Sequence, residues 1–199
     1  MTFAELVAEV VSITKRPDLL ERIKANVRAA TLKAHQSDFY YRDLIEVPVQ
    51  FAEIFILQSF TPTEVVPRFR KAKYIRRWLG DASGHFGNFF TPIQIENSID
   101  GYGCTRNEVY YMAGQALQMR GAVPIDKILF GCYQHPLIAP EASYDSWIAV
   151  DMPYVIIYEA ARVTFKSYSF TEAANEYSQL VAEQFSELKL SYVDDVPLT

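Results

Sequence analysis

The sequence predicts an α+β fold: a four-helix bundle formed by N- and C-terminal helical pairs, with a central antiparallel β insertion and an extended C-terminal tail. Apolar residues recur at helical spacing at both ends of the chain, alternate with polar residues in the middle, and lose all period in the last nine residues. We therefore expect the helical bundle over residues 1–44 and 144–190, the β-rich insertion over 45–143 and the tail over 191–199.

Length and composition indicate a folded chain with more than one surface to bury. A protein of 199 residues buries roughly 70% of the surface that its unfolded chain exposes, and half of these residues are hydrophobic. There are 13 Tyr and 13 Phe, and such rings serve both cores and subunit interfaces.

The N-terminal pair begins with a capping box, in which Thr2 is followed three residues later by Glu5. The apolar spacing behind it predicts a helix to about Ile13. Pro17 and Asp18 suit the first turn of a second helix, which the pattern extends to about His35.

The middle of the chain changes to the period of β-strands. Short apolar runs are separated by Gly, Pro, Asn and Asp, and residues 113–115 (AGQ) are placed to turn a hairpin. Residues 80–88 (GDASGHFGN) are rich in glycine and predict a flexible loop. The expected segments are 45–51, 55–57, 65–75, 91–95, 109–112, 116–119 and 128–133.

The C-terminal pair contains the most apolar helix of the chain. Residues 155–165 are apolar almost all round, which predicts a central position in the bundle. Ser169 and Glu172 have the spacing of a second capping box, and an amphipathic helix follows it as far as Leu188. The short linker predicts an antiparallel helical hairpin.

Charge and hydropathy exclude several classes of protein. The net charge is −5, and residues 144–199 carry three Lys or Arg against nine Asp or Glu, which disfavours a dedicated nucleic-acid binder. The N-terminus has no basic region of the kind that begins a signal peptide, and no apolar run reaches the roughly 18–20 residues of a membrane span. We expect a protein made in the cytoplasm that makes no contact with a membrane.

The sequence offers little sign of catalysis. It lacks the phosphate-binding GxxxxGK[ST] and GxGxxG motifs and the hydrolase motifs HExxH and GxSxG. His35, His85 and His135 have no second ligand at metal spacing, and Cys104 and Cys132 form neither a metal motif nor a disulfide framework. We expect no catalytic residues, no metal and no cofactor.

One dense charge feature stands out, the basic segment of residues 68–78. Its basic side chains alternate with aromatic ones and leave three interpretations open: a solvated strand face, a contact with an acidic neighbour such as the C-terminal third of another copy, or a contact with a phosphate backbone. These side chains are Arg68, Arg70, Lys71, Lys73, Arg76 and Arg77.

Seven stretches, in order along most of the chain, have a recognisable pattern. They are 6–10 (LVAEV), 14–19 (TKRPDL), 29–35 (AATLKAH), 38–44 (DFYYRDL), 128–136 (ILFGCYQHP), 152–161 (MPYVIIYEAA) and 176–177 (EY). These stretches resemble the head-to-tail adaptor proteins of tailed bacteriophages, also called connector, neck or gatekeeper proteins. The similarity lies in packing patterns, not in a catalytic signature.

The resemblance implies a structural virion protein at the head–tail interface. It implies a ring of twelve copies, a dodecamer, beneath the portal protein, which extends the DNA channel and presents a platform to the tail or nozzle protein. Packaged double-stranded DNA would pass through it without sequence-specific contact. The C-terminal end would dock on the portal through Leu188, Tyr192, Val193, Asp194, Asp195, Val196, Pro197, Leu198 and Thr199.

Two alternatives compete with the adaptor. One is another neck, tail-tube or head-completion subunit of the same kind of virion. The other, from a different class, is a small enzyme or accessory binding protein, which would be a monomer or small oligomer with a ligand pocket.

Overall fold

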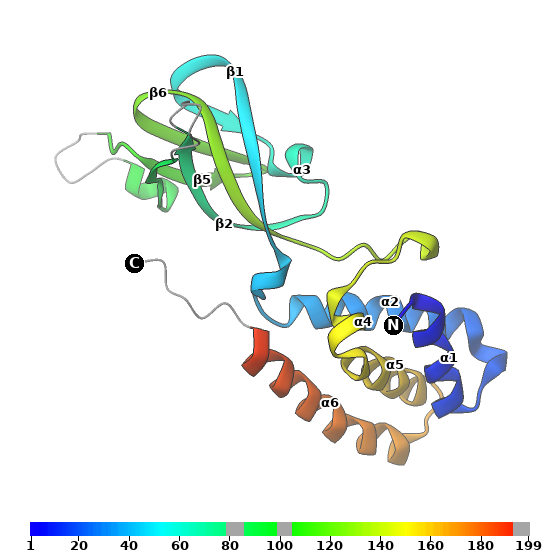
Figure 1. The fold of residues 1–199 in the computed structure, drawn as a ribbon. Coiled ribbons are helices and arrows are strands. Elements are labelled where there is room, and N and C mark those ends of the chain that lie inside the picture. Colours follow the sequence, from blue (N-terminus) through cyan, green and yellow to red (C-terminus); the bar gives the residue numbers. More distant parts are fainter. Residues whose placement is uncertain (79–85, 99–104, 193–199) are drawn as a thin grey trace. The chain divides into compact units, whose positions relative to one another are not determined.

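The computed structural model describes residues 1–78, 86–98 and 105–192, and these form two compact units (Figure 1). The helical unit consists of residues 1–43 together with the described residues from 135 onward. The β unit is Leu44–Gln134.

The predicted fold class is wrong. The described residues form a mixed α/β protein with six α-helices and a nearly closed, barrel-like sheet of six strands, not a four-helix bundle with a small central β insertion. The sequence pattern divided the middle of the chain into short segments. One strand of 17 residues instead runs through the expected segments 45–51 and 55–57, and one of 19 residues runs through 116–119 and 128–133.

The helical unit is built around its most apolar helix. Val155, Ile156 and Ile157 are fully buried in α5, and this helix contacts α1, α2 and α6. Because α5 is apolar on several sides, the other helices gather around it, and no bundle of two equal hairpins forms. The helices are α1 (Phe3–Thr14), α2 (Leu20–Gln36), α4 (Trp147–Asp151), α5 (Pro153–Ser167) and α6 (Thr171–Tyr192), with the 3₁₀ turns η1 (Pro17–Leu19), η2 (Tyr41–Asp43) and η4 (Glu141–Ser143).

Of the two capping boxes predicted from the sequence, the structure contains one. The capping box at α1 is confirmed: the Thr2 amide donates to Glu5 Oε2 at 2.8 Å, and the Glu5 amide donates to Thr2 Oγ1 at 3.3 Å. The second predicted capping box is wrong. Ser169 has a φ of 62°, in the left-handed region, whereas an N-cap residue is extended, and α6 begins at Thr171.

The β unit is organised by β6, the longest strand. Along one edge β6 pairs with β1, and along its other edge it pairs first with β5 and then with β2, always antiparallel. The strands are β1 (Leu44–Phe60), β2 (Phe69–Trp78), β3 (Phe86–Phe89), β4 (Thr91–Pro92), β5 (Val109–Ala113) and β6 (Ala116–Gln134), with the short helices α3 (Pro62–Val65) and η3 (Ile95–Ser98).

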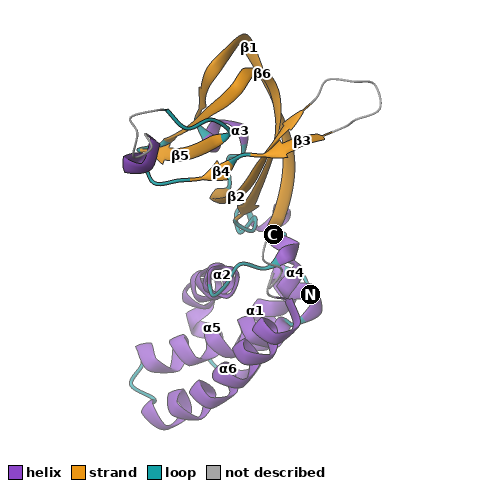
Figure 2. Cartoon of the chain, turned by 90° about the vertical axis from the view of Figure 1, so that its left-hand side faces the viewer, coloured by secondary structure: helices purple, strands orange, loops and turns teal. Residues whose placement is uncertain are grey.

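The sheet curls because β1 and β6 bend together (Figure 2). The register shifts on either side of the pair Phe55–Ile125. β1 has the extra residues between Gln50, opposite Lys127, and Phe55, and β6 has them between Ile125 and Arg120, opposite Leu57, so each strand bulges once. The bend brings the two halves of this antiparallel strand pair face to face, with the Phe60 ring centroid 5.2 Å from that of Phe130.

Residues 86–92 nearly close the barrel on the other side. Phe89 pairs with Arg76 of β2, the Phe90 amide donates to the Ile75 carbonyl at 2.9 Å, and Thr91 pairs with Val109 of β5. One short stretch therefore links the two strands that share an edge of β6. The enclosed core consists of Val49, Val66, Ile75, Phe90, Tyr110, Leu117, Met119, Ile125, Ile128, Phe130 and Cys132.

The two turn predictions in this region have different outcomes. The hairpin at residues 113–115 is confirmed: Ala113 pairs with Ala116, and Gly114 supplies the positive φ of 64° that the turn needs. The loop predicted over 80–88 falls mostly on 80–85, outside the described residues, while Phe86, Gly87 and Asn88 belong to β3.

Candidate assembly surfaces

The six cations of the basic segment do not share one surface. Arg77 is buried inside the β unit, whereas Lys73 and Arg76 lie over the rings of Tyr133 and Phe89 at 5.8 and 4.7 Å. Arg70 and Lys71 line a groove, and Arg68 precedes β2. The three interpretations of the segment stay open for Arg68, Arg70, Lys71, Lys73 and Arg76, but the position of Arg77 gives it a role inside the fold.

Arg77 holds the bend of β6. Its guanidinium donates to the carbonyls of Pro124 and Val123 at 3.0 and 3.2 Å and to Glu108 Oε1 at 2.9 Å. A Cβ on Gly121 would lie 2.3 Å from Arg77 Nη2, so glycine makes room for this contact. Because a bulge leaves carbonyls without a strand partner, the buried guanidinium satisfies groups that the ladder cannot reach.

A groove of about 680 Å³ opens where the barrel is incompletely closed, between the start of β2 and the middle of β5. Its walls are mostly apolar and aromatic, with Ile95 and Met112 among the exposed large hydrophobic residues of the chain. Arg70, Lys71 and Glu96 add charge. The lining residues are Phe69, Arg70, Lys71, Ala72, Pro92, Ile93, Gln94, Ile95, Glu96, Tyr110, Tyr111 and Met112.

The most unusual surface is an apolar ridge on β1, Ile54–Leu57. These four consecutive large hydrophobic residues have exposed fractions between 43% and 59%. Successive side chains of a strand point to opposite faces, so this part of β1 is exposed on both faces. Within the described residues β1 pairs with β6 alone. Contiguous apolar patches of this kind mark interaction sites in soluble proteins.

The ridge is held by hydrogen bonds on either side of the bend. Gln58 follows it directly and is buried, and its amide nitrogen donates to the Glu53 carbonyl at 2.6 Å and to the Ile125 carbonyl at 3.0 Å. These bonds tie the β1 bulge to β6. The β unit therefore presents the ridge in a fixed conformation, which lowers the entropy lost when a partner covers it.

The helical unit contains a buried cluster with the residue types of a hydrolase triad. His35 Nδ1 lies 2.8 Å from Asp43 Oδ1, and His35 Nε2 lies 2.9 Å from Ser146 Oγ. All three side chains are buried, and Ser146 Oγ also caps α4 by accepting from the Ala149 amide at 3.3 Å. Trp147 Nε1 donates to the same Asp43 oxygen at 2.7 Å. A nucleophile sealed in the core reaches no substrate, so we assign the cluster to packing of α2, η2 and α4.

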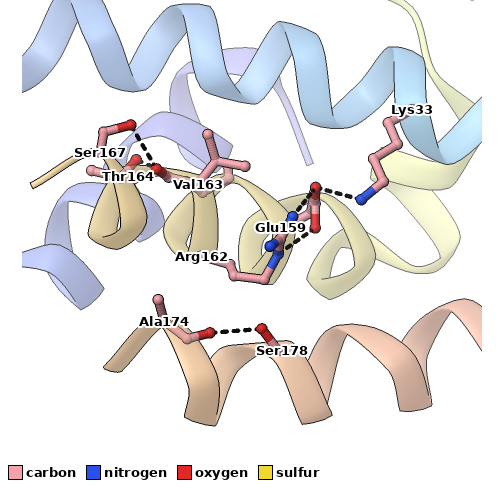
Figure 3. Close-up of polar contacts among 9 residues, drawn as sticks. Lys33, Glu159, Arg162, Val163, Thr164, Ser167, Ala174 and Ser178 are labelled. Carbon is pink, nitrogen blue, oxygen red and sulfur yellow. Dashed lines mark hydrogen bonds and ion pairs between the residues drawn. The ribbon is translucent and has the colours of Figure 1, made fainter. Parts of the chain in front are cut away.

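A second polar cluster, centred on the buried Glu159, joins α2 to α5 (Figure 3). The Glu159 carboxylate accepts from Lys33 at 2.6 Å and from two nitrogens of Arg162 at 2.9 Å each. Burial would raise the pKa of Glu159, but the bonds from Arg162 and Lys33 outweigh burial and hold that pKa below its ordinary value. The three side chains border a 360 Å³ pocket against α6. Both cations already face a carboxylate, so the arrangement stabilises the helical unit.

The predicted portal-docking residues divide between the core and the undescribed end of the chain. Leu188 is fully buried in the helical core. Tyr192 still belongs to α6, so helix continues past the expected start of the tail at Ser191. Its ring centroid lies 4.9 Å from that of Trp147, and its hydroxyl donates to Asp151 Oδ2 at 3.3 Å. Val193, Asp194, Asp195, Val196, Pro197, Leu198 and Thr199 lie outside the described residues, and their docking role stays a prediction.

No group of three or more His, Cys, Asp or Glu side chains within residues 1–78, 86–98 and 105–192 is arranged to hold a metal ion. His85 and Cys104 lie outside these residues. In the described helices, none has both the length and the apolar character needed to cross a membrane.

The sequence pattern of the ridge did not show whether these residues are buried or exposed, and no sequence pattern predicted the groove. Four consecutive apolar residues are also typical of a buried strand, and periodicity alone does not separate the two cases. The groove arises from residues far apart in the chain.

Comparison with models of known protein families gives no match, and no curated protein is significantly similar to this chain in sequence.

Proposed function

We propose that this chain is a non-enzymatic structural subunit that assembles with copies of itself into the head-to-tail adaptor ring of a tailed bacteriophage. The observation that carries the proposal is the apolar ridge, because four exposed large hydrophobic residues in a fixed conformation are a surface prepared for a protein partner. A ring requires two different contact surfaces on each copy, since its contacts are heterologous.

The choice of an adaptor rests on the resemblance described above. The stretches that carry it belong to α1, η1, α2, the segment from residue 38 through η2 to the start of β1, the C-terminal end of β6, and α5 and α6. In this proposal the ring contains twelve copies, joins the portal protein to the tail or nozzle protein, and surrounds packaged double-stranded DNA without reading its sequence. Its site is the head–tail interface of the virion, and it assembles in the host cytoplasm without a membrane.

Another neck, tail-tube or head-completion subunit would present a similar assembly surface. The protein that this chain binds therefore distinguishes these functions. The test is electron microscopy of the purified full chain mixed with the portal protein of the same virus. We expect rings of this chain stacked coaxially on the portal rings. Rings or tubes that form without portal contact would favour a tail-tube subunit, and a chain that stays monomeric with portal present would overturn the proposal.

A further inference from the structure

The β unit carries both a protruding apolar surface and an apolar groove. The ridge lies at the bend of β1, and the groove lies between β2 and β5. We propose that the ridge of one copy inserts into the groove of the next copy, and that this contact joins neighbouring subunits. The inference rests on the proposed ring function and names the surfaces that build the ring.

The groove has room for large side chains, and both surfaces are apolar. The groove volume of about 680 Å³ falls within the roughly 300–1,000 Å³ of pockets that bury a drug-sized molecule, so it has room for a few large side chains. Ile95 and Met112 in the groove are exposed, as are the ridge residues, and burying both sets together removes apolar surface from water. An apolar centre of this kind is typical of subunit interfaces.

Charge gives the contact a direction. Glu53 is exposed and directly precedes the ridge, whereas the groove wall carries two cations, Arg70 and the exposed Lys71, against one carboxylate, Glu96. With the ridge of one copy in the groove of the next, the carboxylate of Glu53 approaches these cations. Opposite charges at an interface steer association and fix which surfaces meet.

The ridge and the groove belong to different strands. β1 occupies one edge of β6, while β2 and β5 occupy the other edge, so each copy presents two separate surfaces. Two different surfaces that meet between copies give a head-to-tail contact, which generates a closed ring when the rotation closes.

The first test is a charge exchange in the full chain, read as molar mass by light scattering. Glu53→Lys and Lys71→Glu should each weaken assembly about tenfold, and the double variant should recover it because the pair is restored in the opposite sense. Glu9→Lys, an exposed change in α1, is the matched control and should assemble normally. If the double variant assembles only as weakly as the two single effects multiplied together, the proposed contact is overturned.

The second test is disulfide trapping between two chains in a Cys104→Ser background. Cys132 can remain, because it is buried and burial raises its pKa to about 11, which suppresses the reactive thiolate. A chain with Leu57→Cys mixed with a chain with Ile95→Cys should give a covalent pair. Leu190→Cys, at a residue 90% exposed in α6, mixed with Ile95→Cys is the control and should not.

The outcomes separate this inference from the proposed function. Rings that form normally but give no Leu57–Ile95 pair would overturn the ridge-and-groove contact and leave the ring function standing. A chain that forms no ring with or without portal would overturn the proposed function, and the inference with it. Circular dichroism melting of each variant shows that the β unit has folded.

Discussion

Single buried polar residues fix the shape of the β unit. Gln58 and Arg77 each donate to main-chain carbonyls in the bulges of β1 and β6. A buried carbonyl without a donor is destabilising by about 1–3 kcal/mol, so these side chains allow the long antiparallel pair of β1 and β6 to bend sharply. The ridge and the curvature of the sheet both depend on them.

Replacing Arg77 by Met should therefore destabilise the β unit. The change removes the donors for Pro124 and Val123 and leaves Glu108, which is partly exposed, without its cation. We expect a loss of about 2–4 kcal/mol in urea unfolding monitored by tryptophan fluorescence. Arg106→Met, at an exposed position, is the control and should change stability by less than about 0.5 kcal/mol. Equal stability of the two variants would contradict the role assigned to Arg77.

Glu159 makes the stability of the helical unit depend on pH. Its pKa in the folded protein lies below the ordinary value of 4.5, so its bonds stabilise the fold above about pH 4.5 and are lost as pH falls through the folded-state pKa. Glu159→Gln should lower the unfolding free energy by about 1.5–3 kcal/mol at pH 7, because the bonds to Lys33 and Arg162 lose their charge.

The difference between wild type and Glu159→Gln should shrink in acid, where the wild-type carboxyl is also protonated. Urea unfolding at several pH values measures it. Glu141→Gln removes an exposed ion pair with Arg28 and should have an effect of at most about 1 kcal/mol. A Glu159→Gln effect that is constant from pH 7 to pH 3 would show that the charge is unimportant.

Among the elements, β6 organises the β unit and α5 the helical unit. Gly131 of β6 faces Glu46 on β1 and Tyr74 on β2. The Tyr74 ring covers Gly131, and its hydroxyl donates to Glu46 Oε1, so one side chain spans three strands. Burial, followed by the bond to Glu46, raises the pKa of Tyr74 above its ordinary value. The glycine is required because a Cβ at Gly131 would lie 2.5 Å from the Tyr74 ring.

Gly131→Ala should push the Tyr74 ring off the strand and destabilise the β unit by about 1–3 kcal/mol. The same substitution in a Tyr74→Ala background should have much less effect, because the clash is gone. The four unfolding free energies of this double-mutant cycle measure the coupling. A coupling of zero would mean that the ring does not sit over Gly131 in solution.

Local signals in the sequence predicted elements better than they predicted architecture. The first capping box, the hairpin at residues 113–115 and the central apolar helix each depend on neighbouring residues and are confirmed. The barrel-like closure depends on contacts between residues 75 and 90 and between 91 and 109, which no periodicity reveals. The sequence shows where the six basic residues of the basic segment lie along the chain. It does not show which of them is buried, because that depends on how β2 pairs in the sheet, and this pairing places Arg77 inside the β unit.

At the scale of the molecule, the ridge and groove both belong to the β unit, and the predicted portal contact belongs to the C-terminal end. The core residue Leu188 and the helical residue Tyr192 already have roles in the helical unit. Subunit contact and portal contact should therefore be separable by mutation.

Deleting residues 193–199 tests this separation, because it removes the acidic end of the chain and keeps Tyr192 against Trp147. We expect an unchanged melting temperature and unchanged self-assembly, with loss of binding to portal rings in co-sedimentation. Full portal binding by the truncated chain would rule out the docking role of these seven residues.

If this chain functions by assembling, the molar mass of the particle that it forms shows it. Sedimentation equilibrium of the purified full chain, at increasing concentration and with portal added, measures the number of copies in the particle. We expect a closed assembly of fixed size near twelve copies, reached by the wild-type chain and lost when Phe55 on the ridge is changed to Asp. A wild-type chain that remains a single copy under all these conditions would contradict it.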